Sequence, residues 1–295
     1  LIAVAIVGFH SVATGEYHRA EVEEGRVAGM AVNSNTFGFR MLLGTVALAY
    51  LWILPMRARS IVKVIIIAGM VLAGLGTIAS GSRKAVLGLM AFYVLWVFFC
   101  YRNEAMRRPS ILLGVLTGFL IGGAAFTFAA RDSVVGTRLM RTYKAMTGQA
   151  TREGGTERLA LYIRGFEVLG EHPFVGVGLG GFRIYAGGPM THSDFMEVGT
   201  GLPGLLVYVS ILVVMWWRAG QIVKYSDDPL AVRIAQLMRA TMLVLLMLSL
   251  GRTYFRNKEY WVVMGSFIGY THAVWQDIKA RGLNLLPGAA AGPYG

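Results

Sequence analysis

The amino-acid sequence predicts an all-α polytopic membrane protein with about seven transmembrane helices and a large outer-face loop with short amphipathic helices. Three observations support this prediction. Hydrophobic residues occupy 55% of the 295 positions and charged residues only 15%, whereas soluble globular domains carry about 25% charged residues. The mean hydropathy is +0.56. Seven apolar stretches reach or approach the roughly 20 residues that a transmembrane helix needs, and they lack the alternation of a membrane β-barrel.

The seven stretches lie at about 36–54, 61–80, 85–101, 110–130, 199–217, 234–250 and 260–275. Residues 1–9 are also apolar but too short to span a bilayer, and the first residue is Leu. We therefore expect the chain to be the C-terminal part of a longer protein whose first helices are missing. Residues 1–286 are predicted to form a single integral membrane domain with an outer-face loop at about 131–198. The Ala-, Gly- and Pro-rich residues 287–295 predict a disordered tail.

Charge placement predicts the orientation and argues against nucleic-acid binding, and the cysteine count limits the kinds of site. The loops assigned to the cytoplasm hold eleven basic residues and the short outer loops hold seven, as the positive-inside rule expects. The formal charge is +12, but the basic residues are scattered between apolar runs, which argues against nucleic-acid binding. Cys100 is the single cysteine, so neither an intramolecular disulfide nor a Cys-based metal site can form. No other metal-binding motif occurs, and no metal is predicted.

The outer-face loop contains one predicted amphipathic helix. Thr156 is a suitable N-cap, and His172-Pro173 predicts the end of the helix. Apolar residues recur between them at helical spacing, namely Leu159, Tyr162, Ile163, Phe166 and Leu169. We expect this helix to lie on the membrane over the helical bundle.

The turn of residues 80–84 places two adjacent cations, Arg83 and Lys84, between two apolar stretches. Two interpretations fit this pair equally well. The side chains would either extend to lipid headgroups, or bind a phosphate together with the N–H groups of the turn.

Three further arginines are candidates. Arg158 and Arg164 lie on the predicted loop helix, where solvated ion pairing is the commoner role of such charges. Arg40 lies within a predicted span near its outer end, where a charge is costly and often functional. Arg239 lies within another span, near the predicted inner end.

His192 is the candidate for proton transfer. It precedes the span at 199–217, and a neighbouring carboxylate, Asp194 or Glu197, would orient it. An interfacial histidine is more often only a hydrogen-bonded polar residue. Residues 176–181 match G-x-G-x-x-G, but no strand-turn-helix unit surrounds them, so nucleotide binding is rejected.

The order of these motifs resembles the O-antigen ligase and O-antigen polymerase superfamily of bacterial membrane glycosyltransferases. The resemblance covers roughly residues 26–217 and rests on the spacing of four blocks. These are Arg26–Gly29 with Asn33–Asn35, Ser80–Arg83, Arg158 ahead of Glu171–Gly178, and His192–Glu197 ahead of Gly201–Gly204. The sequence departs from the family in having Ser193 after His192, where an asparagine is familiar.

The resemblance implies glycan transfer at the outer, periplasmic face of the bacterial inner membrane, within cell-envelope and lipopolysaccharide biosynthesis. The donor would be a glycan on undecaprenyl pyrophosphate. The acceptor would be lipid A-core for a ligase, a lipid-linked glycan for a polymerase, or a protein for some relatives. The family chemistry needs no nucleotide sugar and, for the ligases, no metal, so no cofactor is expected.

The residues acquire roles from this chemistry. Arg83 and Arg158 would stabilise the departing pyrophosphate, and His192 would accept the proton of the acceptor hydroxyl. Five residues are candidates for substrate binding, namely Lys84, Arg26, Arg164, Arg40 and Glu197. Two alternatives remain open from the residues alone. One is an exporter or flippase of anionic lipid-linked glycans, although no internal repeat is evident, and the other is a structural membrane protein whose loop docks cell-wall partners.

Overall fold

A computed structural model of the chain describes residues 34–55, 60–107, 156–178, 181–182, 201–250, 254 and 257–284. Within these ranges the regular structure is helical, which confirms the predicted all-α class. The helices are α2 (Ser34–Ile53), α3 (Ser60–Ala79), α4 (Arg83–Arg107), α7 (Thr156–Glu171), α10 (Leu202–Tyr225), α11 (Pro229–Ser249) and α12 (Lys258–Asn284).

Five of these helices are long and apolar enough to cross a membrane, and they match five of the seven predicted spans. They are α2, α3, α4, α10 and α11. The last predicted span, 260–275, lies within α12, which is 27 residues long but is not among those five. The predicted span at 110–130 and the predicted tail at 287–295 lie outside the described residues. The count of seven spans therefore stays a prediction, whereas a multi-pass membrane protein is supported.

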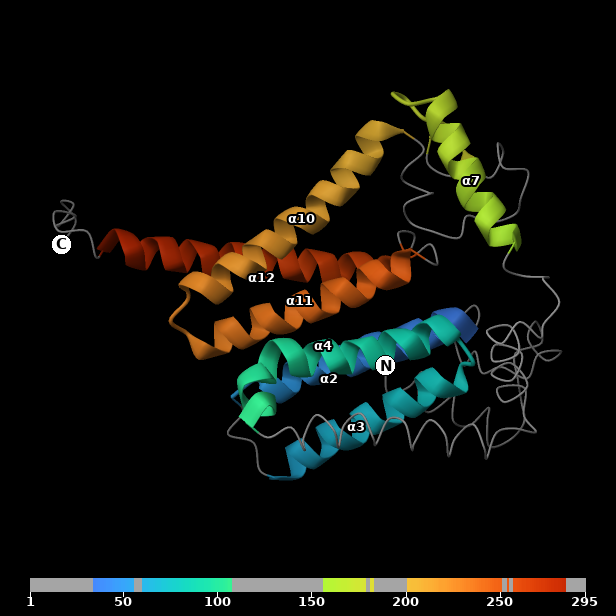
Figure 1. The fold of residues 1–295 in the computed structure, drawn as a ribbon. Coiled ribbons are helices and arrows are strands. Elements are labelled where there is room, and N and C mark those ends of the chain that lie inside the picture. Colours follow the sequence, from blue (N-terminus) through green and yellow to red (C-terminus); the bar gives the residue numbers. More distant parts are fainter. Residues whose placement is uncertain are drawn as a thin grey trace.

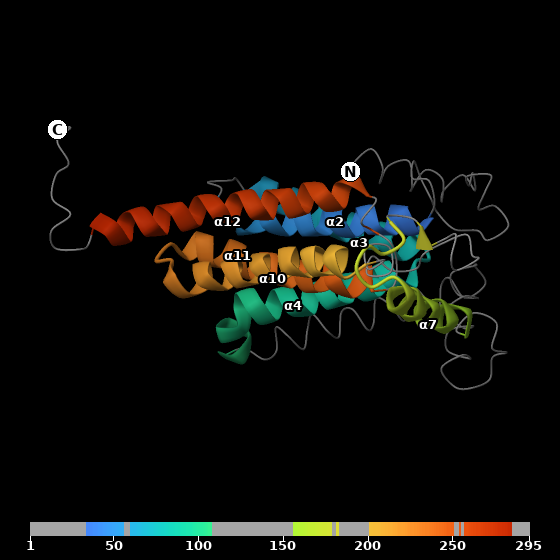
Figure 2. The ribbon, with the colours of Figure 1, turned by 90° about the horizontal axis from the view of Figure 1, so that it is seen from above.

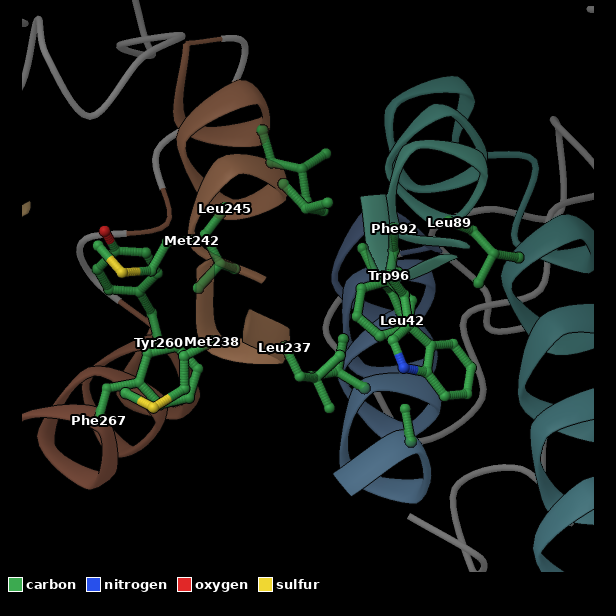
Figure 3. Close-up of a cluster of buried hydrophobic side chains, with 14 of the residues drawn as sticks. Leu42, Leu89, Phe92, Trp96, Leu237, Met238, Met242, Leu245, Tyr260 and Phe267 are labelled. Atoms are coloured by element: carbon green, nitrogen blue, oxygen red, sulfur yellow. The ribbon is translucent and has the colours of Figure 1, made fainter. Parts of the chain in front are cut away.

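The helices form an elongated bundle in which α11 has a central place (Figures 1 and 2). It contacts α4, α10, α2 and α12, while α3 packs mainly on α2. Figure 3 shows the buried side chains that α2, α4, α11 and α12 contribute to one cluster. Leu42, Phe92, Leu237 and Tyr260 are among its members and are each at most 1% exposed. Burial of this kind fixes how the helices are rotated about their axes.

The outward sides of the bundle are apolar. On α3, Ile61, Val64 and Ile65 are each more than 60% exposed, and on α10 the same holds for Leu206 and Val207. Soluble monomers rarely expose so much contiguous apolar surface. A lipid environment accounts for it, because hydrocarbon tails are as apolar as these side chains.

Helix α11 begins earlier than the predicted apolar stretch. Helix α11 begins at Pro229, capped by Asp228, whose side chain accepts from the N–H of Leu230 at 2.9 Å. Because the helix starts five residues before the predicted stretch, Arg239 lies in its middle and not near its end. The Arg239 guanidinium carbon lies 4.2 Å from the ring centroid of Trp216, a cation–π contact that stabilises a cation within a span.

Candidate functional site

The helix ends that flank the predicted outer loops lie at one end of the bundle. Helices α2, α4, α10 and α12 begin there, α3 and α11 finish there, and α7 packs there (Figure 1). We call this end the α7 end.

The predicted site residues fall into three groups. Arg26, His192 and Glu197 lie outside the described residues, so their predicted roles remain untested. The structure gives the backbone positions of Arg83, the first residue of α4, and of Arg158, the third residue of α7. The side chains of the remaining three, Lys84, Arg164 and Arg40, are described.

Two buried serines close the turn between α3 and α4. The Ser80 hydroxyl donates to the carbonyl oxygen of Thr77 at 2.6 Å and accepts from the N–H of Ser82 at 3.1 Å. The Ser82 hydroxyl accepts from the N–H of Ala85 at 3.5 Å, in the manner of an N-cap. Ser80 is 0% exposed and Ser82 is 3% exposed. Breaking these hydrogen bonds would leave buried polar groups unsatisfied, so the turn is held in one conformation.

Two glycines allow this turn to close and to seat against α2. Gly81 has φ 61°, a left-handed conformation that favours glycine. Gly38 of α2 faces the turn, because a Cβ at this position would lie 2.4 Å from Ser80 Oγ and 3.0 Å from Ala85 Cβ. The contact between α2 and the turn fixes where α4 begins.

The start of α4 is electropositive. Arg83 and Lys84 are its first two residues, and its first turn contains no acidic residue. The free N–H groups of a helix start carry roughly half a positive charge. Basic side chains at this position add to that charge instead of neutralising it. A helix start with basic residues and no acidic residue is a position that favours an anion.

Helix α7 confirms the predicted loop helix and ends at Glu171, directly before His172-Pro173. It is attached to the bundle at two points. The Tyr162 hydroxyl donates to the carbonyl oxygen of Leu250 at the end of α11. After the helix, the N–H of Leu202 donates to the Pro173 carbonyl at 2.8 Å. In Figure 1, α7 crosses the end of the bundle, with its last turn near the start of α10.

Arg164 is engaged along the surface of α7. It contacts Glu167 at 2.9 Å and Glu171 at 3.2 Å, and all three side chains are at least 36% exposed. The hydrogen bond to Glu167 raises the pKa of the Arg164 guanidinium above its ordinary value. These contacts are the solvated ion pairing that is the commoner role of such charges. They compete with binding of a substrate by Arg164.

Arg40 pairs with Glu259, the second residue of α12. The Arg40 guanidinium contacts Glu259 Oε1 at 2.7 and 2.9 Å, and both side chains are less than one third exposed. Burial raises the pKa of the Glu259 carboxyl, but its backbone hydrogen bond and Arg40 outweigh burial and hold the pKa below its ordinary value. Gly38 lies two residues before Arg40, about 200° around the helix. Arg40 therefore faces α12, while the opposite side of α2 faces the turn that carries Arg83.

Three of these features carry no local sequence signal and were not predicted. They are the partner of Arg40, the packing of the turn against Gly38, and the packing of α10 on the segment after α7. Within the described residues, no group of three or more His, Cys, Asp or Glu side chains could hold a metal ion.

A comparison with known families supports the resemblance to O-antigen ligases. A family model described as O-Antigen ligase matches residues 68–209. No curated protein matches the chain. The matched region includes the turn, α4, α7 and the start of α10, together with six of the eight predicted site residues, and leaves out Arg26 and Arg40. This match supports the resemblance of the chain to the O-antigen ligase and O-antigen polymerase superfamily.

Proposed function

We propose that this protein transfers a glycan from undecaprenyl pyrophosphate to a sugar hydroxyl at the periplasmic face of the bacterial inner membrane. The observation that carries the proposal is the electropositive start of α4. The buried serine turn holds it rigidly, it contains no acidic residue, and it lies within the matched ligase region.

The leaving group of this reaction explains the need for fixed cations. The acceptor oxygen attacks the anomeric carbon of the donor, the bond from that carbon to the pyrophosphate oxygen breaks, and its electron pair stays on the pyrophosphate. Negative charge therefore grows on the leaving group in the transition state. Arg83 and Arg158 stabilise this charge, and a rigid helix start does so without reorganisation. Lys84 and Arg26 are secondary phosphate ligands.

The acceptor side requires a base, because a sugar hydroxyl is a poor nucleophile. His192 accepts the hydroxyl proton as the new glycosidic bond forms. Glu197 orients the imidazole or contacts the acceptor sugar. Helix α7 covers the reacting groups and limits attack by water on the donor.

Arg40 and Arg164 have a lesser place in this proposal than Arg83 and Arg158. Both already pair with carboxylates, so a substrate phosphate would have to displace Glu259 or Glu167. Arg40 also faces α12, away from the turn of Arg83. We assign them to positioning the helices around the substrate.

The test uses the full-length protein in liposomes with native undecaprenyl-pyrophosphate glycan and purified lipid A-core. A single-step shift of lipid A-core on a gel identifies a ligase, and a ladder of lengthening lipid-linked glycan identifies a polymerase. Glycan appearing on an added protein acceptor identifies a protein O-oligosaccharyltransferase. If the donor binds but no acceptor is modified, the transfer proposal is refuted and export of the lipid-linked glycan takes its place.

Three variants separate the roles. Arg83→Ala should lose product and also bind the donor more weakly, whereas His192→Ala should lose product and keep donor binding. Arg281→Ala is the matched control, because Arg281 is a cation paired with Asp277 at the opposite end of the bundle. Full transfer by an inserted Arg83→Ala protein contradicts the assignment.

A further inference from the structure

The turn after α7 exposes two adjacent apolar side chains. Phe174 is 77% exposed and Val175 is 92% exposed. On α7 itself, Ile163 and Phe166 are also more than half exposed. Such a group of large apolar side chains indicates a surface that contacts another apolar phase.

The exposed turn lies at the level where α10, a candidate membrane span, begins. Leu202 is the first residue of the candidate span Leu202–Tyr225, and its N–H donates to the Pro173 carbonyl at 2.8 Å. A Cβ at Gly201 would lie 3.0 Å from the carbonyl carbon of Val175. Figure 1 shows the turn beside the start of α10, at the edge of the bundle.

The surroundings of the turn are those of a lipid-facing surface. One helical turn into the span, Leu206 is 62% exposed and Val207 is 61% exposed. The apolar surface of α10 therefore continues to the level of Phe174 and Val175 without an intervening charged residue on α10 before Arg218.

The charged residues of α7 adjoin its exposed apolar residues. Ile163 and Phe166 lie about 60° apart around the helix, and Arg164, Glu167 and Glu171, which pair with one another, lie next to Ile163. Apolar side chains beside paired charges are compatible with a helix at a membrane interface, where both acyl chains and water are within reach.

We propose that Phe174 and Val175 insert into the hydrocarbon of the bilayer leaflet at the α7 end and so anchor α7 at the membrane interface. The occupant of this apolar surface is lipid, because the turn continues the lipid-facing side of α10 at the start of its span. The proposal does not depend on glycan transfer.

The test places an environment-sensitive fluorophore on a cysteine at position 174. The Phe174→Cys protein is labelled and reconstituted in nanodiscs, with and without lipids brominated in the upper acyl chain. Glu171→Cys is the matched control, three residues earlier and on the charged face of α7. Cys100 is buried, so the unsubstituted chain is the labelling blank.

Anchoring predicts blue-shifted emission at position 174 that brominated lipid quenches, with neither effect at position 171. Equal, water-like emission at both positions overturns the proposal. So does a blue shift that bromine leaves unquenched and that grows with protein density, which would mean contact with a second copy. In a second measurement, a fluorophore at Phe166→Cys should be quenched less when Val175→Asp is added, and unchanged quenching there would refute anchoring by the turn.

Discussion

Gly38 gives the sharpest test of how the α7 end is built. In Gly38→Ala, the new methyl carbon would lie 2.4 Å from Ser80 Oγ, whereas ordinary contacts begin at 3.4 Å. Either α2 moves away by about 1 Å or the Ser80 hydroxyl gives up its bonds to Thr77 and Ser82. Breaking the hydrogen bonds of Ser80 would cost free energy, because this side chain is fully buried.

The size of the effect follows from three contributions. Overpacking costs about 1 to 3 kcal/mol, and a buried hydrogen bond left unmade costs about 1 to 3 kcal/mol. Alanine stabilises a helix by about 1 kcal/mol relative to glycine, which offsets part of this cost. We expect Gly38→Ala to lower the free energy of unfolding by about 3 kcal/mol, within a range of about 1 to 5 kcal/mol.

The assay is unfolding in mixed micelles, followed by helical circular dichroism. Gly265→Ala on α12 is the control, because nothing lies within 4 Å of the new methyl carbon, and it should be neutral or stabilising. The double variant Gly38→Ala with Ser80→Ala should cost less than the two single variants added together, since removing the hydroxyl relieves the closest contact. If Gly38→Ala behaves like Gly265→Ala, or if the two costs simply add, the reasoning is refuted.

Two further predictions concern how helices are joined at the α7 end. Glu259→Gln should destabilise the protein by about 1 to 2 kcal/mol near neutral pH, because Arg40 loses its charged partner. The pKa of the Glu259 carboxyl is lowered in the folded protein. Its contribution to the free energy of unfolding is therefore complete above the ordinary pKa of a glutamate and is lost as the pH falls through the lowered pKa. The free energies of unfolding of variant and parent should then converge in acid. A difference that persists below the lowered pKa would contradict this. Gly201→Ala should release the segment after α7 from α10, seen as faster proteolysis there, because the methyl carbon would lie 2.8 Å from the backbone nitrogen of Gly176. Gly220→Ala, with open space around it, should be unaffected, and equal proteolysis of both variants would speak against the contact.

Local features were predictable wherever the physical cause is local. Apolar runs matched to the bilayer thickness gave five spans that the described helices confirm. The end of α7 before His172-Pro173 followed from the missing N–H and fixed backbone of proline. The start of α11 was placed too late because the polar residues around Asp228 and Arg233 hid a capped first turn.

The all-helical membrane class, the turn that carries Arg83 and the resemblance to the superfamily were predictable from the chain alone, because length, hydropathy and motif order are properties of the chain. The folded structure was needed to show that Arg40 pairs with Glu259, which is 219 residues away, and that Gly38 packs against the turn. It also placed the segment after α7 against Gly201 at the level where α10 begins. These contacts depend on how each helix is rotated about its axis. Packing of whole apolar faces sets that rotation, so no single residue in the sequence predicts it.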